Sequence, residues 1–137
     1  IAVYLDLGLK EMVDPNNPTE SIDWDMAFMR FNIQVNGGTS GPGGMKVLKV
    51  TDSAYDDMTQ APAGDYITDG DGTGATGYAM EDWYDYDSVN HGVIPFDLFY
   101  VIHGQDDIYY KFKVHSYYDA AGSPAMLALE WATIDAP

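Results

Sequence analysis

The chain has no cysteine and little positive charge, and these two absences exclude several classes of protein. Without cysteine there is no disulfide, no thiolate metal site and no cysteine nucleophile. Six Lys and Arg stand against 22 Asp and Glu, so the formal net charge is −16. Nucleic-acid backbones and anionic membranes are recognised through clustered positive charge, so we expect neither as a partner. No apolar run approaches the ~20 residues of a membrane-spanning helix, so we expect no membrane span.

Helical patterning is also nearly absent. No stretch keeps the apolar spacing of an amphipathic helix over about ten residues without a Gly or Pro interrupting it. The 14 glycines and 7 prolines instead separate short runs rich in Tyr, Phe, Val and Ile, which are typical of strands joined by turns. The sequence therefore predicts an all-β, antiparallel sheet protein with little or no helix. Its 137 residues are expected to form a single domain spanning 1–137.

The expected strands fall on six runs, and two features of these runs are informative. The runs are residues 2–9, 22–35, 45–50, 98–103, 108–118 and 125–134. In the second run, the apolar face changes phase between Phe28 and Phe31, which predicts a β-bulge near Met29–Arg30. The clearest hairpin joins the fourth and fifth runs through the turn Gly104–Asp107.

The middle of the chain is acidic and contains a short pattern of possible calcium ligands. Residues 50–110 carry no Lys or Arg and hold 13 of the 22 acidic residues. Within them, Asp69 and Asp71 alternate with glycines, as oxygen ligands do in a calcium loop. An EF-hand would also need a Glu at position 12, where this sequence has Met80, and flanking helices. The same residues fit a solvated acidic turn, so both interpretations stay open.

The segment 65–82 is expected to be mobile. It holds four glycines between positions 70 and 77, five acids and no basic residue. Little apolar area is therefore available to offset the entropy lost when the segment is ordered. We expect a loop that becomes better ordered when a ligand or calcium binds.

Catalytic motifs are lacking, so we expect a binding protein and not an enzyme. Ser40 has no Gly-x-Ser-x-Gly elbow around it, and adjacent acids such as Asp106 and Asp107 point to opposite faces of an extended strand. His91 follows a run of alternating aromatic and acidic residues that begins at Trp83. An imidazole in such surroundings could bind a metal or stack on a ring, although a plain turn residue is the alternative.

Several segments together resemble one family. Residues 24–33 read Trp-Asp-Met-Ala-Phe-Met-Arg-Phe-Asn-Ile, and residues 36–41 read Asn-Gly-Gly-Thr-Ser-Gly. This block resembles the hallmark of the HmuY haem-binding lipoproteins. The opening strand, the turn at 61–66 and the hairpin that ends at Tyr118 are similar to further elements of that family, in the same order.

The resemblance implies a non-catalytic extracellular protein that takes part in iron acquisition. Such a protein would be secreted, or tethered to the outer membrane through a lipidated cysteine upstream of Ile1. It would capture haem, free or from a haem-carrying protein, and pass it to an outer-membrane receptor.

The resemblance also implies where haem would bind. Family members hold the iron between two axial side chains, which are His in some and Met in others. One lies in the loop after a Trp that precedes the last large hairpin, and His91 occupies that loop here. The other comes from an upstream hairpin that is largely missing in this chain, so Met80 or Tyr78 is the candidate. The aromatic pocket would be formed by Trp83, Tyr84 and Tyr86.

A second interpretation keeps the fold but not the haem. The segment with the candidate ligands has no Lys or Arg to balance the two haem propionates. The chain would then be a non-catalytic surface structural or interaction protein, and its acidic, tyrosine-rich segment 65–91 would contact a partner, with or without calcium.

Overall fold

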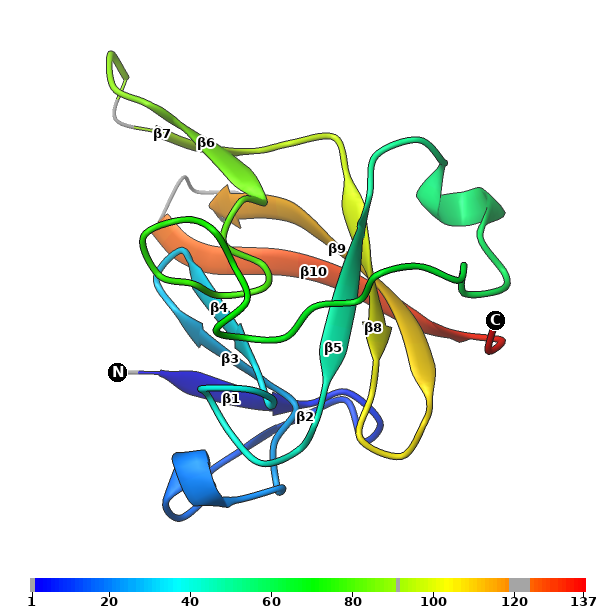
Figure 1. Cartoon of the computed structure of the whole chain (residues 1–137). Coiled ribbons are helices and arrows are strands. Elements are labelled where there is room, and N and C mark those ends of the chain that lie inside the picture. The colour runs from blue at the N-terminus through cyan, green and yellow to red at the C-terminus, as the bar shows by residue number, and fades with distance from the viewer. Residues whose placement is uncertain (1, 91, 119–123) are drawn as a thin grey trace.

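The computed structural model describes residues 2–90, 92–118 and 124–137, and within them it consists of three antiparallel sheets (Figure 1). The first sheet has the order β2-β1-β3-β4 and the second has the order β10-β9-β8-β5. A small third sheet pairs β6 with β7. The bounds are β1 Val3–Asp6, β2 Glu11–Val13, β3 Met26–Met29, β4 Asn32–Val35, β5 Lys46–Val50, β6 Tyr84–Asp87, β7 Gly92–Pro95, β8 Phe99–His103, β9 Tyr109–Tyr118 and β10 Pro124–Ile134.

Helix is confined, in the described residues, to two single 3-10 turns at Pro18–Glu20 and Tyr55–Asp57. The all-β prediction is therefore confirmed. None of the described helical segments has the length and apolar character that crossing a membrane requires.

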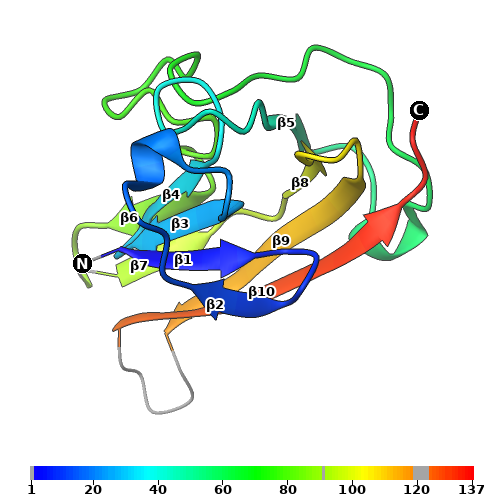
Figure 2. The same cartoon turned by 90° about the horizontal axis from the view of Figure 1, so that it is seen from below.

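One buried cluster joins the two large sheets. Leu5, Met26 and Ile33 from the first sheet share this cluster with Ile102 and Phe112 from the second. The indole N–H of Trp131 on β10 also donates to the backbone oxygen of Leu7, at 3.1 Å. Figure 2 shows the first sheet lying across the long strands β9 and β10. Burial of these apolar faces against each other is the main force that stabilises the pair of sheets.

The structure corrects two of the predicted N-terminal strands. The run 2–9 does not continue as one strand, because β1 ends at Asp6 and β2 returns antiparallel to it after a turn. The run 22–35 is also two strands. The phase change that predicted a bulge is a tight turn, in which Arg30 has a positive φ of 55° and Met29 pairs with Asn32. A left-handed residue at that position reverses the chain, so the apolar residues on both sides return to the same core.

The C-terminal hairpin is confirmed. Strands β8 and β9 pair from Tyr100 with Phe112 to His103 with Tyr109, and the expected turn joins them.

By contrast, the hairpin β6–β7 was not predicted. Its first strand reads Tyr-Asp-Tyr-Asp, and we interpreted this run as part of a loop. Figure 1 shows this hairpin projecting from the rest of the molecule.

The block that resembles the family hallmark forms hydrogen bonds to several loop segments. Trp24 and Asn36 are both buried, and the side-chain Nδ2 of Asn36 donates to the backbone oxygens of Ser21 and Trp24, at 2.9 and 2.8 Å. The amide oxygen of Asn36 accepts the N–H of Gly43, at 2.9 Å. The carboxylate of Asp25 accepts the N–H of Leu7, at 2.7 Å. The block thus joins the segments next to β1, β3 and β5 and contributes stability.

Candidate functional site

A surface hollow of about 340 Å³ lies beside the loop that joins β5 to β6. Most of its lining comes from residues 71–84, and Asn32 of β4 and Ile67 complete it. The side chains and backbone segments that line it are Asn32, Ile67, Asp71, Gly72, Thr73, Gly74, Ala75, Thr76, Tyr78, Ala79, Glu81, Asp82 and Tyr84. The hollow therefore lies where the acidic segment meets the base of the β6–β7 hairpin.

Aromatic rings form one wall of the hollow. The ring of Tyr84 lies 5.3 Å from the ring of Phe31 and 4.9 Å from that of Trp83, measured between centroids. Burial, reinforced by the negative charge of Glu81, raises the pKa of the Tyr84 hydroxyl, so this group is neutral at physiological pH. The hydroxyl of Tyr78 accepts a hydrogen bond from the side-chain amide of Gln34, at 3.0 Å. This wall offers flat apolar surface with two phenol groups.

Asp69 fixes the start of the loop to the sheets. It is 1% exposed, and one carboxylate oxygen accepts the N–H of Val35 at 3.0 Å and the hydroxyl of Ser40 at 2.7 Å. The other oxygen accepts the N–H of Ala79, at 3.0 Å. Burial raises the pKa of Asp69 and outweighs the opposing effect of these hydrogen bonds. The carboxylate therefore ties three separate segments of backbone together.

Glu81 fixes the rest of the loop. Its carboxylate accepts the N–H of Gly74 at 2.5 Å, the hydroxyl of Thr76 at 2.8 Å and the N–H of Gly77 at 3.0 Å. The segment 65–82 is thus a hydrogen-bonded loop that closes on its own carboxylate. Its mobility stays a prediction. The sequence did not indicate Glu81 as a structural group, because two of its three donors are backbone N–H groups, which no side-chain pattern reports.

Asp82, in the lining of the hollow, contacts two residues of the second sheet. Its carboxylate forms an ion pair with Lys49 of β5, at 2.5 Å, and accepts a hydrogen bond from the hydroxyl of Tyr100 of β8, at 3.2 Å. Both partners of the ion pair are about half exposed, so the pair contributes little to stability. Its effect on the site is to reduce the negative charge beside the hollow.

The predicted haem residues are divided between the hollow and the core. Tyr78 and Tyr84 line the hollow. Met80 is fully buried in the core cluster, and Trp83 is 1% exposed, with its indole N–H donating to the backbone oxygen of Phe31 at 3.0 Å.

Two further predicted residues lie elsewhere. Tyr86 lies on β6 with 51% of its surface exposed and is not part of the lining of the hollow. His91 lies outside the described residues, so its role as an iron ligand stays a prediction.

The calcium prediction finds no support in the described part of the chain. The oxygens of Asp69 are engaged by protein donors, and one oxygen of Asp71 accepts the N–H of Thr68 at 3.1 Å. No group of three or more His, Asp or Glu side chains with the geometry of a metal site occurs among the described residues. A calcium ion would need about six oxygen ligands.

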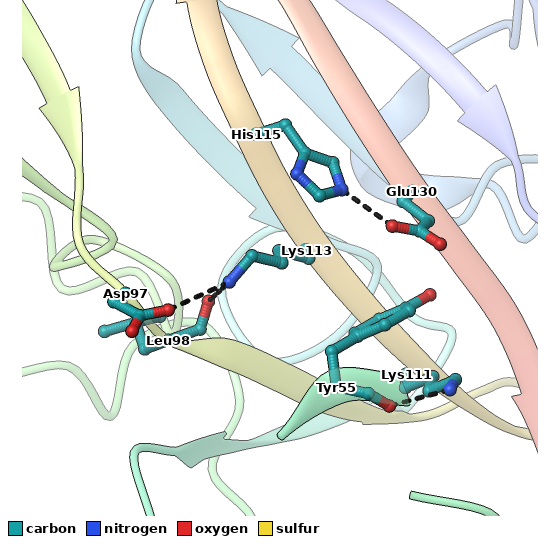
Figure 3. Close-up of polar contacts among 7 residues, drawn as sticks. All are labelled: Tyr55, Asp97, Leu98, Lys111, Lys113, His115 and Glu130. Atoms are coloured by element: carbon teal, nitrogen blue, oxygen red, sulfur yellow. Dashed lines mark hydrogen bonds and ion pairs between the residues drawn. The ribbon is translucent and has the colours of Figure 1, made fainter. Parts of the chain in front are cut away.

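Two of the six Lys and Arg residues, Lys111 and Lys113, lie on β9, and each has a partner (Figure 3). Lys111 donates to the backbone oxygen of Tyr55 at 2.7 Å and lies 4.2 Å from the centre of its ring. Lys113 approaches Asp97 at 3.5 Å.

His115 continues the same face of β9. Its Nε2 lies 2.7 Å from the carboxylate of Glu130 on β10 (Figure 3). No Lys or Arg is among the described residues that line the hollow.

These features define a class of all-β protein in which a long loop and a projecting hairpin frame a surface hollow on one side of two packed sheets. The sequence model of the HmuY protein family matches residues 2–91, which is more than half of the chain. The chain therefore belongs to the HmuY family. No curated protein matches the sequence.

Solved structures share the fold. The apo HmuY analog of Tannerella forsythia has 14% identity and a TM-score of 0.71, over 97% of this chain and 88% of that one. Apo PinO of Porphyromonas gingivitis has 14% identity and a TM-score of 0.71, over 98% and 91%. A candidate HmuY-like haem-binding protein of Bacteroides vulgatus has 16% identity and a TM-score of 0.69, over 95% and 83%.

Proposed function

We propose that this chain is a non-catalytic, extracellular haem-binding protein that captures haem for iron uptake. The observation that carries the proposal is the position of the hollow in a member of the HmuY family. It lies against Tyr84, at the start of the segment after Trp83 where the resemblance to the family implies an iron ligand. A structural neighbour described as a candidate haem-binding protein supports the same function.

The chemistry of the hollow suits one face or edge of a porphyrin. Its volume of about 340 Å³ falls within the range of about 300–1,000 Å³ that is typical of small-molecule sites. Tyr84, Tyr78 and Ile67 offer apolar contact area, and the rings of Phe31 and Trp83 pack against that of Tyr84 in tilted arrangements. The lining also holds three acids, of which Asp82 is paired with Lys49 and Glu81 accepts three hydrogen bonds from its own loop. Bound haem would supply the iron that the protein carries.

The iron ligands are proposed separately from the hollow. His91 is the one strong nitrogen donor in the loop after Trp83, and we assign it one axial position. Met80 is the second candidate, but its thioether is fully buried in the core. Met80 can reach iron only when this side chain leaves the core, which would lose the stability that burial of a Met provides, about 1.5–3 kcal/mol.

Titration with haemin tests these ligands. The expected result is a sharpened Soret band in the wild type and loss of this band in His91→Ala. Met80→Leu removes the sulfur but keeps most of the buried volume, so it separates coordination from packing. We expect Met80→Leu to retain the wild-type band and affinity. A His91→Ala variant with the wild-type spectrum would contradict the assignment of His91 as an iron ligand. A changed spectrum in Met80→Leu would show that the thioether of Met80 is the second iron ligand.

The cellular role follows from the same proposal. The protein would act outside the cell, secreted or anchored to the outer membrane, and would deliver haem to an outer-membrane receptor. The family match and a structural neighbour of Bacteroides fragilis described as a candidate lipoprotein support this location.

A second function is favoured by one specific observation. Full burial of Met80 and a hollow without Lys or Arg in its described lining suit a surface interaction protein that keeps the fold without haem. The same titration distinguishes the two functions, since such a protein would give no Soret change with haemin.

A further inference from the structure

The loop 72–77 forms a cradle of hydrogen-bond donors that is built to the shape of a carboxylate. The N–H groups of Gly74 and Gly77 and the hydroxyl of Thr76 converge on the two oxygens of Glu81, at 2.5, 3.0 and 2.8 Å. The hydroxyl oxygen of Thr76 also accepts the N–H of Tyr78, at 3.2 Å, which fixes its orientation. Successive backbone N–H groups in such loops are a recognised means of binding anions without a basic side chain.

The glycines make room for the carboxylate. A Cβ at Gly74 would lie 2.7 Å from the carboxyl carbon of Glu81, and a Cβ at Gly72 would lie 2.5 Å from one of its oxygens. Gly77 has a positive φ of 71°, and its backbone oxygen accepts the N–H groups of Gly70 and Gly72, at 2.7 and 3.0 Å. The backbone is therefore closed into a ring whose space is taken by the carboxylate group.

The cradle favours a charged carboxylate. Desolvation acts to raise the pKa of Glu81, but the hydrogen bonds from Gly74, Thr76 and Gly77 outweigh it and lower this pKa. The donors are exposed or only partly buried, and Glu81 itself is partly exposed. Its side chain can therefore move into solvent, and a second carboxylate can replace it without leaving buried groups unpaired.

We propose that this cradle is the propionate site of the haem pocket, which Glu81 fills in the ligand-free protein and a porphyrin carboxylate takes when the ligand enters. This inference rests on the proposed function. It accounts for how a hollow without Lys or Arg in its described lining binds a dianionic ligand, because neutral N–H groups replace the missing cations. The propionate replaces the carboxylate of Glu81 as acceptor for the N–H groups and the hydroxyl of the cradle. Glu81 therefore competes with the ligand and lowers its affinity.

Metal-free protoporphyrin IX and its dimethyl ester are suitable probes, because neither depends on the iron ligands and they differ only in the carboxylates. Binding is measured by quenching of tryptophan fluorescence in the full chain. Glu81→Ala empties the cradle, and we expect it to bind the free diacid about five- to tenfold more tightly than the wild type does. The ester cannot use the cradle as an anion, so its affinity is expected to rise less than twofold in Glu81→Ala.

Two further variants complete the experiment. Gly74→Ala fills the cradle, so we expect it to bind the diacid more weakly than Glu81→Ala does. Asp65→Ala removes one exposed acid of the same segment and controls for net charge. We expect it to bind both porphyrins as the wild type does.

The outcomes separate the two proposals. If Glu81→Ala binds the diacid no better than Asp65→Ala does, or gains equally for the ester, the exchange is overturned while haem binding stands. If no variant binds either porphyrin and the wild type does not bind haemin, the proposed function is overturned together with the exchange.

Discussion

Replacing Asp69 with Ala is expected to lower the free energy of unfolding by about 3–5 kcal/mol. The carboxylate is 1% exposed and is the common acceptor for donors from Val35, Ser40 and Ala79. Removing it leaves three donors without a partner, two of them backbone N–H groups. Each unpaired buried donor costs about 1–3 kcal/mol, and their effects are not fully additive.

Urea unfolding followed by tryptophan fluorescence measures this loss. Asp69→Asn is the matched variant, because in either orientation of its amide an NH2 group faces a donor, so we expect it to be destabilised as well. Asp65→Ala is the control, since Asp65 is exposed and its loss should change stability by less than about 0.5 kcal/mol. Wild-type stability in Asp69→Ala would show that the carboxylate does not organise the loop.

Replacing Asn36 with Ala is expected to lower the free energy of unfolding by about 2–4 kcal/mol. The side chain is fully buried and bridges the backbone oxygens of Ser21 and Trp24 to the N–H of Gly43. The amide of Gln105 also donates to the oxygen of Trp24, at 2.6 Å, so that oxygen keeps a partner in the variant. The predicted loss is for this reason smaller than for Asp69.

Asn36→Asp isolates the hydrogen bonds from the volume of the side chain. It keeps the acceptor for Gly43 but places a carboxylate oxygen against two carbonyl oxygens, so we expect destabilisation similar to that of Asn36→Ala. Asn16→Ala, at an exposed loop position, is the matched control. Equal stability of Asn36→Ala and Asn16→Ala in urea would refute a structural role for the hallmark block.

The sequence predicted those elements that depend on local patterns. The hairpin β8–β9 follows from two β-rich runs and a turn that contains Gly and two Asp residues. The turn between β3 and β4 was mistaken for a bulge. A positive φ is expected at Gly or Asn, and the residue that adopts it here is Arg30. The hairpin β6–β7 was missed because alternating Tyr and Asp resembles a solvated loop.

The carboxylates of the site could not be predicted from local patterns. Asp69 looked like a calcium ligand or a solvated turn residue, yet two of its three donors come from Val35 and Ser40, distant in sequence. Glu81 looked like one of many surface acids, because two of its three donors are backbone groups that no side-chain pattern reports. Both roles depend on the path of the backbone, which the tertiary structure determines.

Hydrogen exchange with and without haemin tests the central claim most directly, namely that haem binds in the hollow beside Tyr84. We predict that the amides of residues 72–81 and of β6 and β7 exchange more slowly in the presence of haemin, because a bound porphyrin would cover the loop and the base of the hairpin. The amides of β8 and the first half of β9 should be unchanged. Unchanged exchange at 72–81 and in β6, or slowing confined to other strands, would contradict the claim.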